Sequence, residues 1–167
     1  MKRFALLVLA LAFGAAQAGN LAHADRKFIE HAAESGMFEV QIAQLANAKA
    51  NDLQVKNFAG MLADQHTAAN NELVKIASAK GVELPPAPTR SQRREIDKLG
   101  KRNGADFDQH FVREVGIKAH EKDIKSFQKA RDDVQDADLK AFIEKTLPML
   151  QDHLAQAQKL PEAAAKK

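Results

Sequence analysis

The stretch GVELPPAPTRSQRREIDKLGKRNG, residues 81–104, separates two halves of the chain that have a regular apolar spacing. It begins with a glycine, continues with Pro85, Pro86 and Pro88, and then becomes strongly charged. Because glycine and proline interrupt helices, the stretch predicts a connection, with one or two helical turns in its charged part around residues 91–101. A helix of about 27 residues is roughly 40 Å long, a distance that this connection can cross.

Long helices are expected on both sides of this connection. Ala, Leu, Lys, Gln and Glu dominate the composition and favour helix. Apolar residues recur at three- and four-residue spacing in four segments, with Asp25 and Asp136 as expected N-terminal caps and Gly81 as an expected C-terminal cap. The expected helices cover residues 25–50, 53–80, 105–133 and 137–160.

The lengths of the connections predict how these helices are arranged. Tight turns join the first helix to the second and the third to the fourth, so each pair is expected to be an antiparallel hairpin. A plain up-and-down bundle needs only a short loop between hairpins, whereas a long crossover is the ferritin-like connection. We therefore predict an all-α, ferritin-like four-helix bundle over residues 19–160, followed by a disordered tail at residues 161–167.

The start of the chain has the pattern of an export signal. Two basic residues precede an unbroken apolar run over residues 4–13, and small residues follow at Ala16 and Ala18. The run is too short to span a membrane, which takes about 20 apolar residues. The pattern predicts a signal peptide over residues 1–18, cleavage near Ala18, and a periplasmic or secreted protein with no transmembrane segment in the mature chain.

Charge and composition narrow the function classes. The signal holds two of the 25 basic residues and none of the 22 acidic ones, which leaves the mature chain with a net charge of +1. A nearly neutral surface argues against nucleic acid as the partner. The chain has no cysteine, and no nucleophile stands in a catalytic motif, so no classical enzyme activity is expected. An envelope or protein partner and a homodimer stay open.

Each expected helix carries one polar residue on its apolar stripe. Counted from the two tight turns, these residues fall at similar heights, so they are expected to form one layer near the middle of the bundle. The candidate site consists of Glu39, His66, His120 and His153, with Asp64 and Asp123 close enough in sequence to flank them.

Two interpretations of this layer are open. Imidazole is the commonest side-chain ligand of transition metals, and a carboxylate can complete the ligand set, so the layer predicts a metal site. Alternatively, it is a buried hydrogen-bonded network that binds nothing. Di-iron bundles use Glu-x-x-His on two helices. Ala63 and Leu150 stand three residues before His66 and His153, so Zn²⁺ or Cu²⁺ is favoured over iron, and a di-iron-type oxidase is disfavoured.

Several segments together resemble one bacterial family, the domain-of-unknown-function family 4142, often labelled "predicted outer membrane protein". The resemblance implies a ferritin-like bundle and no established enzyme activity. The family's Asp-Asp-His-Thr segment stands here as Asp-Gln-His-Thr, with Gln65 in place of an acid. The matching segments are FIEHAAESGMFEV at 28–40, FAGMLADQHT at 58–67, ADFD at 105–108 with His120, and Leu147-Pro148 with His153-Leu154.

The expected function is therefore that of an exported helical bundle that holds a transition metal in a Glu/His layer and acts in envelope stress or metal handling. The alternative is a purely structural or partner-binding bundle without a ligand, whose polar layer sets the register of the helices.

Overall fold

The computed structural model describes residues 21–161, and every regular element in this range is helical. The prediction of an all-α chain is confirmed. The predicted signal peptide and residues 162–167 of the predicted tail lie outside the described residues. The elements are α1 (His23–Lys49), α2 (Leu53–Ala79), α3 (Arg90–Gly100), α4 (Gly104–His110), the π-helical segment η1 (Phe111–Ala119), α5 (His120–Asp133) and α6 (Ala137–Ala157).

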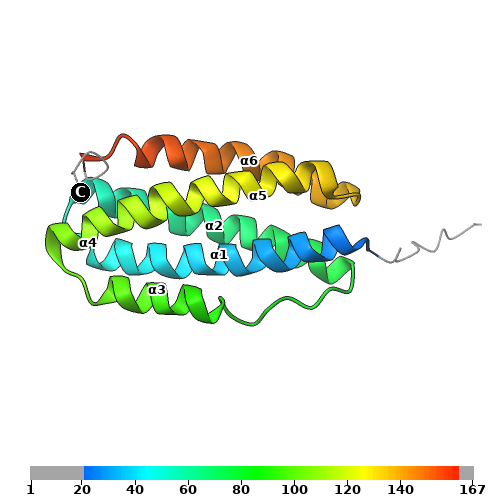
Figure 1. Cartoon of the computed structure of the whole chain (residues 1–167), viewed down its shortest axis with the longest axis horizontal. Coiled ribbons are helices and arrows are strands. Elements are labelled where there is room, and N and C mark those ends of the chain that lie inside the picture. The colour runs from blue at the N-terminus through cyan, green and yellow to red at the C-terminus, as the bar shows by residue number, and fades with distance from the viewer. Residues whose placement is uncertain (1–20, 162–167) are drawn as a thin grey trace, which may run out of the picture.

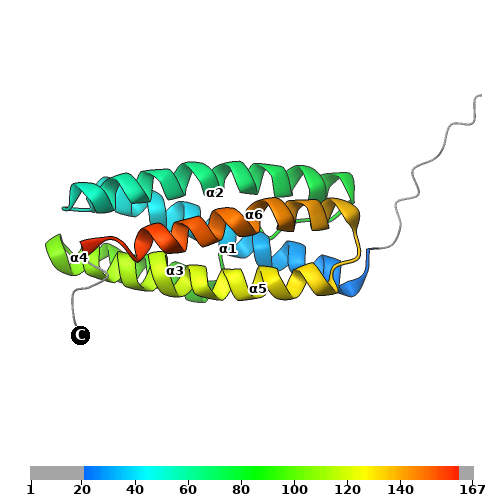
Figure 2. The ribbon, with the colours of Figure 1, turned by 90° about the horizontal axis from the view of Figure 1, so that it is seen from above.

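The long helices lie side by side along the long axis of the molecule, and α3 runs along the outside of α1 (Figures 1 and 2). Helices α1 and α2 form one antiparallel hairpin, and α5 and α6 form another. The expected helix over residues 105–133 is continuous but includes nine residues of π-helix. The charged part of the crossover is helical over α3, whose 11 residues make about three turns, against the one or two turns expected.

Local sequence explains where the helices begin and end. Asp52 and Asp136 cap α2 and α6, each through a carboxylate that accepts backbone N–H groups of the first turn. Gly81 has a φ of +65° and ends α2, as predicted. Asp25 is not the cap residue of α1, because the helix begins earlier; its carboxylate instead accepts the N–H of Ala22 at 3.1 Å.

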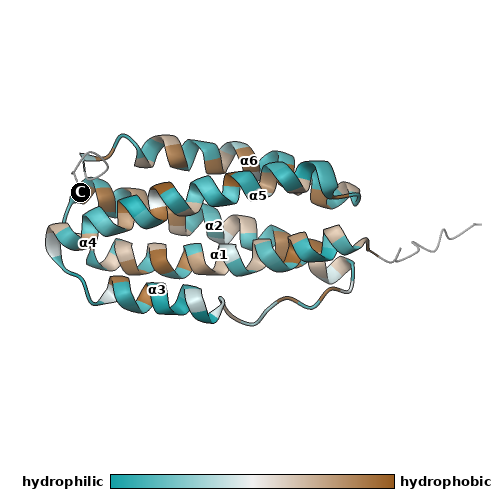
Figure 3. Cartoon of the chain, in the orientation of Figure 1, coloured by the Kyte–Doolittle hydropathy of each residue, from teal (hydrophilic) through white to brown (hydrophobic). Residues whose placement is uncertain are grey.

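The apolar core is divided into two clusters. The first contains Phe28, Leu73 and Phe127, and the second contains Ile42, Leu62 and Phe111. Polar and apolar residues alternate along every long helix, while α3 is mostly hydrophilic (Figure 3). On α2, on α6 and along the continuous stretch of η1 and α5, the switch from one cluster to the other falls within a few residues of the inward histidine. The three inward histidines therefore lie where the two apolar clusters meet.

Two buried carboxylates connect the hairpins. Asp25 of α1 accepts the backbone N–H of Gln135, in the turn between α5 and α6, at 2.8 Å. Asp108 of α4 accepts the N–H groups of Asn51 and Asp52, in the turn between α1 and α2, at 3.0 and 2.8 Å. Each hairpin thus holds the turn of the other, which limits how far the helices can slide past one another.

Candidate metal centre

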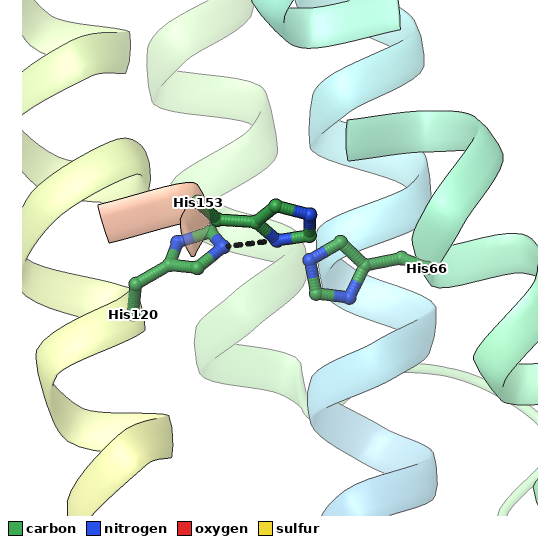
Figure 4. Close-up of side chains that lie close together, drawn as sticks. All are labelled: His66, His120 and His153. Carbon is green, nitrogen blue, oxygen red and sulfur yellow. Dashed lines mark hydrogen bonds between the residues drawn. The ribbon is translucent and has the colours of Figure 1, made fainter. Parts of the chain in front are cut away.

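Three histidine rings meet in the interior of the bundle. His66 comes from α2, His120 from the first turn of α5 and His153 from α6. Their ring centroids are 5.2 to 5.5 Å apart, and one nitrogen of each ring lies within 4.8 Å of the others. Figure 4 shows the rings pointing toward one another. This spacing allows all three to contact a single ion.

The π-helical segment fixes the orientation of the His120 ring. In a π-helix, each carbonyl faces the residue five positions later instead of four. Val115 lies in this segment, and its carbonyl oxygen lies 2.9 Å from Nδ1 of His120, five residues on. Because a carbonyl only accepts, Nδ1 of His120 carries the proton. Its Nε2 therefore carries no proton, and its lone pair faces His153.

Gln65 holds the His153 ring in the same way. The side-chain oxygen Oε1 of Gln65 lies 2.8 Å from Nε2 of His153, so this nitrogen donates. Nδ1 of His153 is then also a lone pair, 3.2 Å from Nε2 of His120 (Figure 4). If the Gln65 amide were turned around, its NH₂ would donate to His153, and a proton on Nδ1 would close a hydrogen bond to His120. The orientation of the Gln65 amide thus decides whether the lone pairs of His120 and His153 are both available to an ion.

Three buried polar atoms in the layer have no hydrogen-bond partner among the described residues. They are both carboxylate oxygens of Glu39 and Nε2 of His66. Glu39 is 1% exposed and His66 4% exposed, so water at the surface does not satisfy them. An unpaired buried polar atom costs about 1–3 kcal/mol. Within residues 21–161, the fold itself supplies no hydrogen bond to these three atoms.

Burial also sets the charge of these groups. It lowers the pKa of His66 and His120, and it lowers the pKa of His153 to about 4, with the neighbouring rings adding to the effect at His66 and His153. Burial raises the pKa of Glu39 well above its ordinary value, and the nearby Asp123 raises it further. At neutral pH the three imidazoles are therefore uncharged, as metal ligands must be.

The acids of the predicted site are placed differently from one another. Glu39 is buried, but it is not part of the compact group formed by the three rings. Asp123 is buried and accepts a hydrogen bond from the Ser35 hydroxyl at 2.6 Å. Asp64 is exposed and lies outside the buried layer. The prediction thus located all three imidazoles, whereas its carboxylates are spread over a wider region.

Sequence reasoning missed the two groups that orient the rings. Gln65 adjoins His66, and Val115 precedes His120 by five residues, a spacing that carries no signal in a regular α-helix. The position of Gln65 next to a candidate ligand could have indicated its role, because the second ring nitrogen of a metal-bound histidine usually has a hydrogen-bond acceptor.

A family model described as "Domain of unknown function (DUF4142)" matches residues 10–160 of the chain. No curated protein matches significantly, and neither does any solved structure. Within residues 21–161, none of the helices is both long and apolar enough to cross a membrane.

Proposed function

The chain belongs to the family described as domain of unknown function (DUF4142), and from the chemistry of its buried layer we propose that it binds a divalent transition metal through His66, His120 and His153. The observation that carries the proposal is the direction of the ring nitrogens. Val115 and Gln65 take the outer N–H groups of two rings, and the third ring brings an unpartnered nitrogen. This is the usual arrangement around metal-bound histidine.

The distances suit a small ion. With metal–nitrogen bonds of about 2.0–2.1 Å and tetrahedral angles, two ligand nitrogens are about 3.3–3.4 Å apart. Nε2 of His120 and Nδ1 of His153 are 3.2 Å apart. Binding therefore needs little rearrangement of this pair, and His66 closes the third side.

The donor set favours Zn²⁺ or Cu²⁺ over iron. Three neutral imidazoles suit these borderline ions. Dinuclear iron sites in bundles need Glu-x-x-His pairs, which the chain lacks at His66 and His153. Glu39 is the group that would balance the charge of the ion, because its carboxylate is buried and without a partner. A di-iron-type oxidase is not supported.

A layer without a ligand is the competing function, in which the bundle is structural or binds a partner. The contact between His120 and His153 favours it if the Gln65 amide donates, since that contact is then a complete hydrogen bond. This arrangement still leaves Glu39 and Nε2 of His66 without partners. An ion at the three rings gives Nε2 of His66 a partner, and the buried Glu39 carboxylate would balance its charge. We favour the metal for that reason.

The wider setting is also part of the proposal. Two antiparallel hairpins and a crossover along α1 support a ferritin-like four-helix arrangement. The apolar run over residues 4–13 supports export by a cleaved signal. We propose that the mature protein works in the periplasm or outside the cell, in metal handling or envelope stress.

The test uses the mature chain, residues 19–167, purified without a histidine tag. Bound metal is measured by mass spectrometry, and Zn²⁺, Cu²⁺ and Fe²⁺ are titrated by calorimetry. We expect one Zn²⁺ or Cu²⁺ per chain, with affinity lowered at least 100-fold in His120→Ala and unchanged in His23→Ala, which alters an exposed histidine. Binding weaker than millimolar, or equal binding by both variants, would overturn the proposal.

A further inference from the structure

The three rings are 0 to 4% exposed, so an ion can reach them only if part of the bundle moves. We propose that the ion enters and leaves between α2 and α6, by displacement of the Gln65 side chain, and that the ion pair of Glu72 with Lys145 closes the outer mouth of this route. The inference rests on the proposed metal binding and adds the path by which the site exchanges its ion.

Gln65 connects the site with the surface. On its inner side, Oε1 holds the ring of His153 at 2.8 Å. On its outer side, Gln65 lines a surface pocket of ≈ 490 Å³ between α2 and α6. Glutamine has several rotatable bonds, so its side chain can swing out while the backbone of both helices stays in place. One rotamer change would expose a ring nitrogen of the site to this pocket.

The inner wall of the same pocket is thin. Ala69 and Thr146 line both the surface pocket and a cavity of ≈ 20 Å³ inside the bundle. His66 and Asp123 also line this cavity, which is large enough for one water molecule. An ion that loses its water shell therefore meets the polar groups of Asp123 and His66 on the inner side of the wall.

The outer mouth is crossed by an ion pair. Nζ of Lys145 on α6 lies 2.5 Å from Oε2 of Glu72 on α2, and both residues line the pocket. The side chains are 71% and 36% exposed. Such pairs contribute little to stability. The pair can therefore open readily, and an arriving cation competes with Lys145 for the Glu72 carboxylate.

A second route is less suitable. A pocket of ≈ 430 Å³ between α1 and α2 reaches the inner cavity at Asn70, but Met37, Leu73 and Val74 make it mostly apolar, and they offer a hydrated ion no strong ligands. Asn70 also fills the notch above Gly36, where an added Cβ would lie 1.9 Å from its Oδ1. The polar pocket between α2 and α6 is thus the better path.

The first experiment compares two variants that remove the same charge from the same pocket. Zn²⁺ alone is added to metal-free mature protein in a stopped-flow instrument, and release is followed with a chelating dye. Lys145→Gln opens the ion pair, whereas Lys75→Gln removes a cation of the same pocket that has no ion pair within residues 21–161. We expect Lys145→Gln to speed association and release several-fold with an unchanged Kd. Equal rate changes in both variants would show that the ion pair of Glu72 with Lys145 does not close the route.

The second experiment blocks each route. Ala68→Trp fills the pocket between α2 and α6, and Ser78→Trp fills the apolar pocket. We expect Ala68→Trp to slow association and release at least tenfold, with Kd unchanged, and Ser78→Trp to have no effect. The reverse result, or unaltered rates in both, would overturn the route while leaving metal binding intact. Absence of Zn²⁺ binding in the wild type would instead overturn the proposed function itself.

Discussion

Asp25 and Asp108 occupy equivalent positions in the two hairpins. Each is a buried carboxylate near the start of its hairpin, and each accepts backbone N–H groups from the turn of the other hairpin. Asp25 precedes the capping residue Asp52 by 27 positions, and Asp108 precedes Asp136 by 28. The additional residue falls in the stretch that contains η1, whose turns hold more residues than those of an α-helix.

This relationship predicts a loss of stability in Asp108→Ala and Asp25→Ala. Each change removes a buried, charged acceptor from backbone N–H groups of the opposite turn, so we expect the free energy of unfolding to fall by about 1–3 kcal/mol per variant. Urea unfolding followed by circular dichroism measures it, with Asp132→Ala, an exposed acid, as the control. A loss no larger than that of the control would mean that the turns do not need these carboxylates.

The hydrogen bonds of Asp25 and Asp108 also show which features the sequence predicts and which it does not. The apolar stripes of the four helices predicted that Glu39 and the three histidines face inward, and all four are buried, because burial of such a stripe follows directly from helical periodicity. The sequence did not predict the equivalent roles of Asp25 and Asp108, because a hydrogen bond between residues 110 positions apart leaves no local pattern. The sequence did not predict the π-helical segment either, because its apolar spacing resembles that of an α-helix.

The π-helical segment predicts a specific effect of removing one residue. Deletion of the exposed Lys118 would let residues 111–119 form a regular α-helix, with Val115 bonded to the backbone instead of to His120. We expect a folded protein whose Zn²⁺ affinity is about 10- to 100-fold lower, as for other losses of an outer hydrogen bond to a ligand histidine. Calorimetry measures the affinity.

Deletion of Lys125 is the matched control for this experiment. It removes an exposed lysine from the regular part of α5 and should unfold the protein, because no surplus residue absorbs the change of register. Wild-type affinity after loss of Lys118 would show that the π-helical segment does not orient His120.

The buried histidines predict an acid-sensitive metal-free protein. Their pKa values are lowered in the fold, so the unfolded chain binds more protons as the pH falls below about 6.5. Stability should therefore be complete above that pH and decline as the pH falls toward 4, where His153 itself titrates in the fold. His153 alone should contribute on the order of 3 kcal/mol to this decline.

Urea unfolding at a series of pH values checks this expectation. His153→Gln should flatten the decline between pH 6.5 and 4, whereas His23→Gln should not, because His23 is exposed. A pH profile that is the same in His153→Gln and in the wild type would contradict the assignment.

Glu39 predicts an effect of opposite sign. Its pKa is raised in the fold, so its contribution to stability is complete below about pH 4.5 and is lost as the pH rises through the folded pKa. Glu39→Gln removes this loss, and we expect the metal-free variant to be more stable than the wild type at pH 8 by about 1–3 kcal/mol. The same variant should bind Zn²⁺ more weakly, because the buried charge that balances the ion is absent.

Thermal unfolding with and without Zn²⁺ separates the two effects of Glu39→Gln. Glu34→Gln, which changes a carboxylate of α1 outside the buried layer, is the control. A variant that is less stable without metal would show that the carboxylate has a partner in the fold.

Gln65 predicts the affinity of the whole site, because it determines which nitrogen of His153 is free. In Gln65→Leu the His153 ring loses its acceptor, and we expect Zn²⁺ affinity to fall about 10- to 100-fold. In Gln65→Glu a carboxylate accepts the same N–H and makes the ring a stronger ligand, so affinity should equal or exceed that of the wild type. Gln41→Leu, at an exposed position of α1, controls for the change in polarity.

Nitrogen-15 NMR of the histidines reports the tautomer directly: His153 should be protonated on Nε2 in the wild type and in Gln65→Glu. A proton on Nδ1 of His153 in the metal-free wild type would mean that the Gln65 amide donates, and the pair of rings would then be a closed hydrogen bond that an ion must first break.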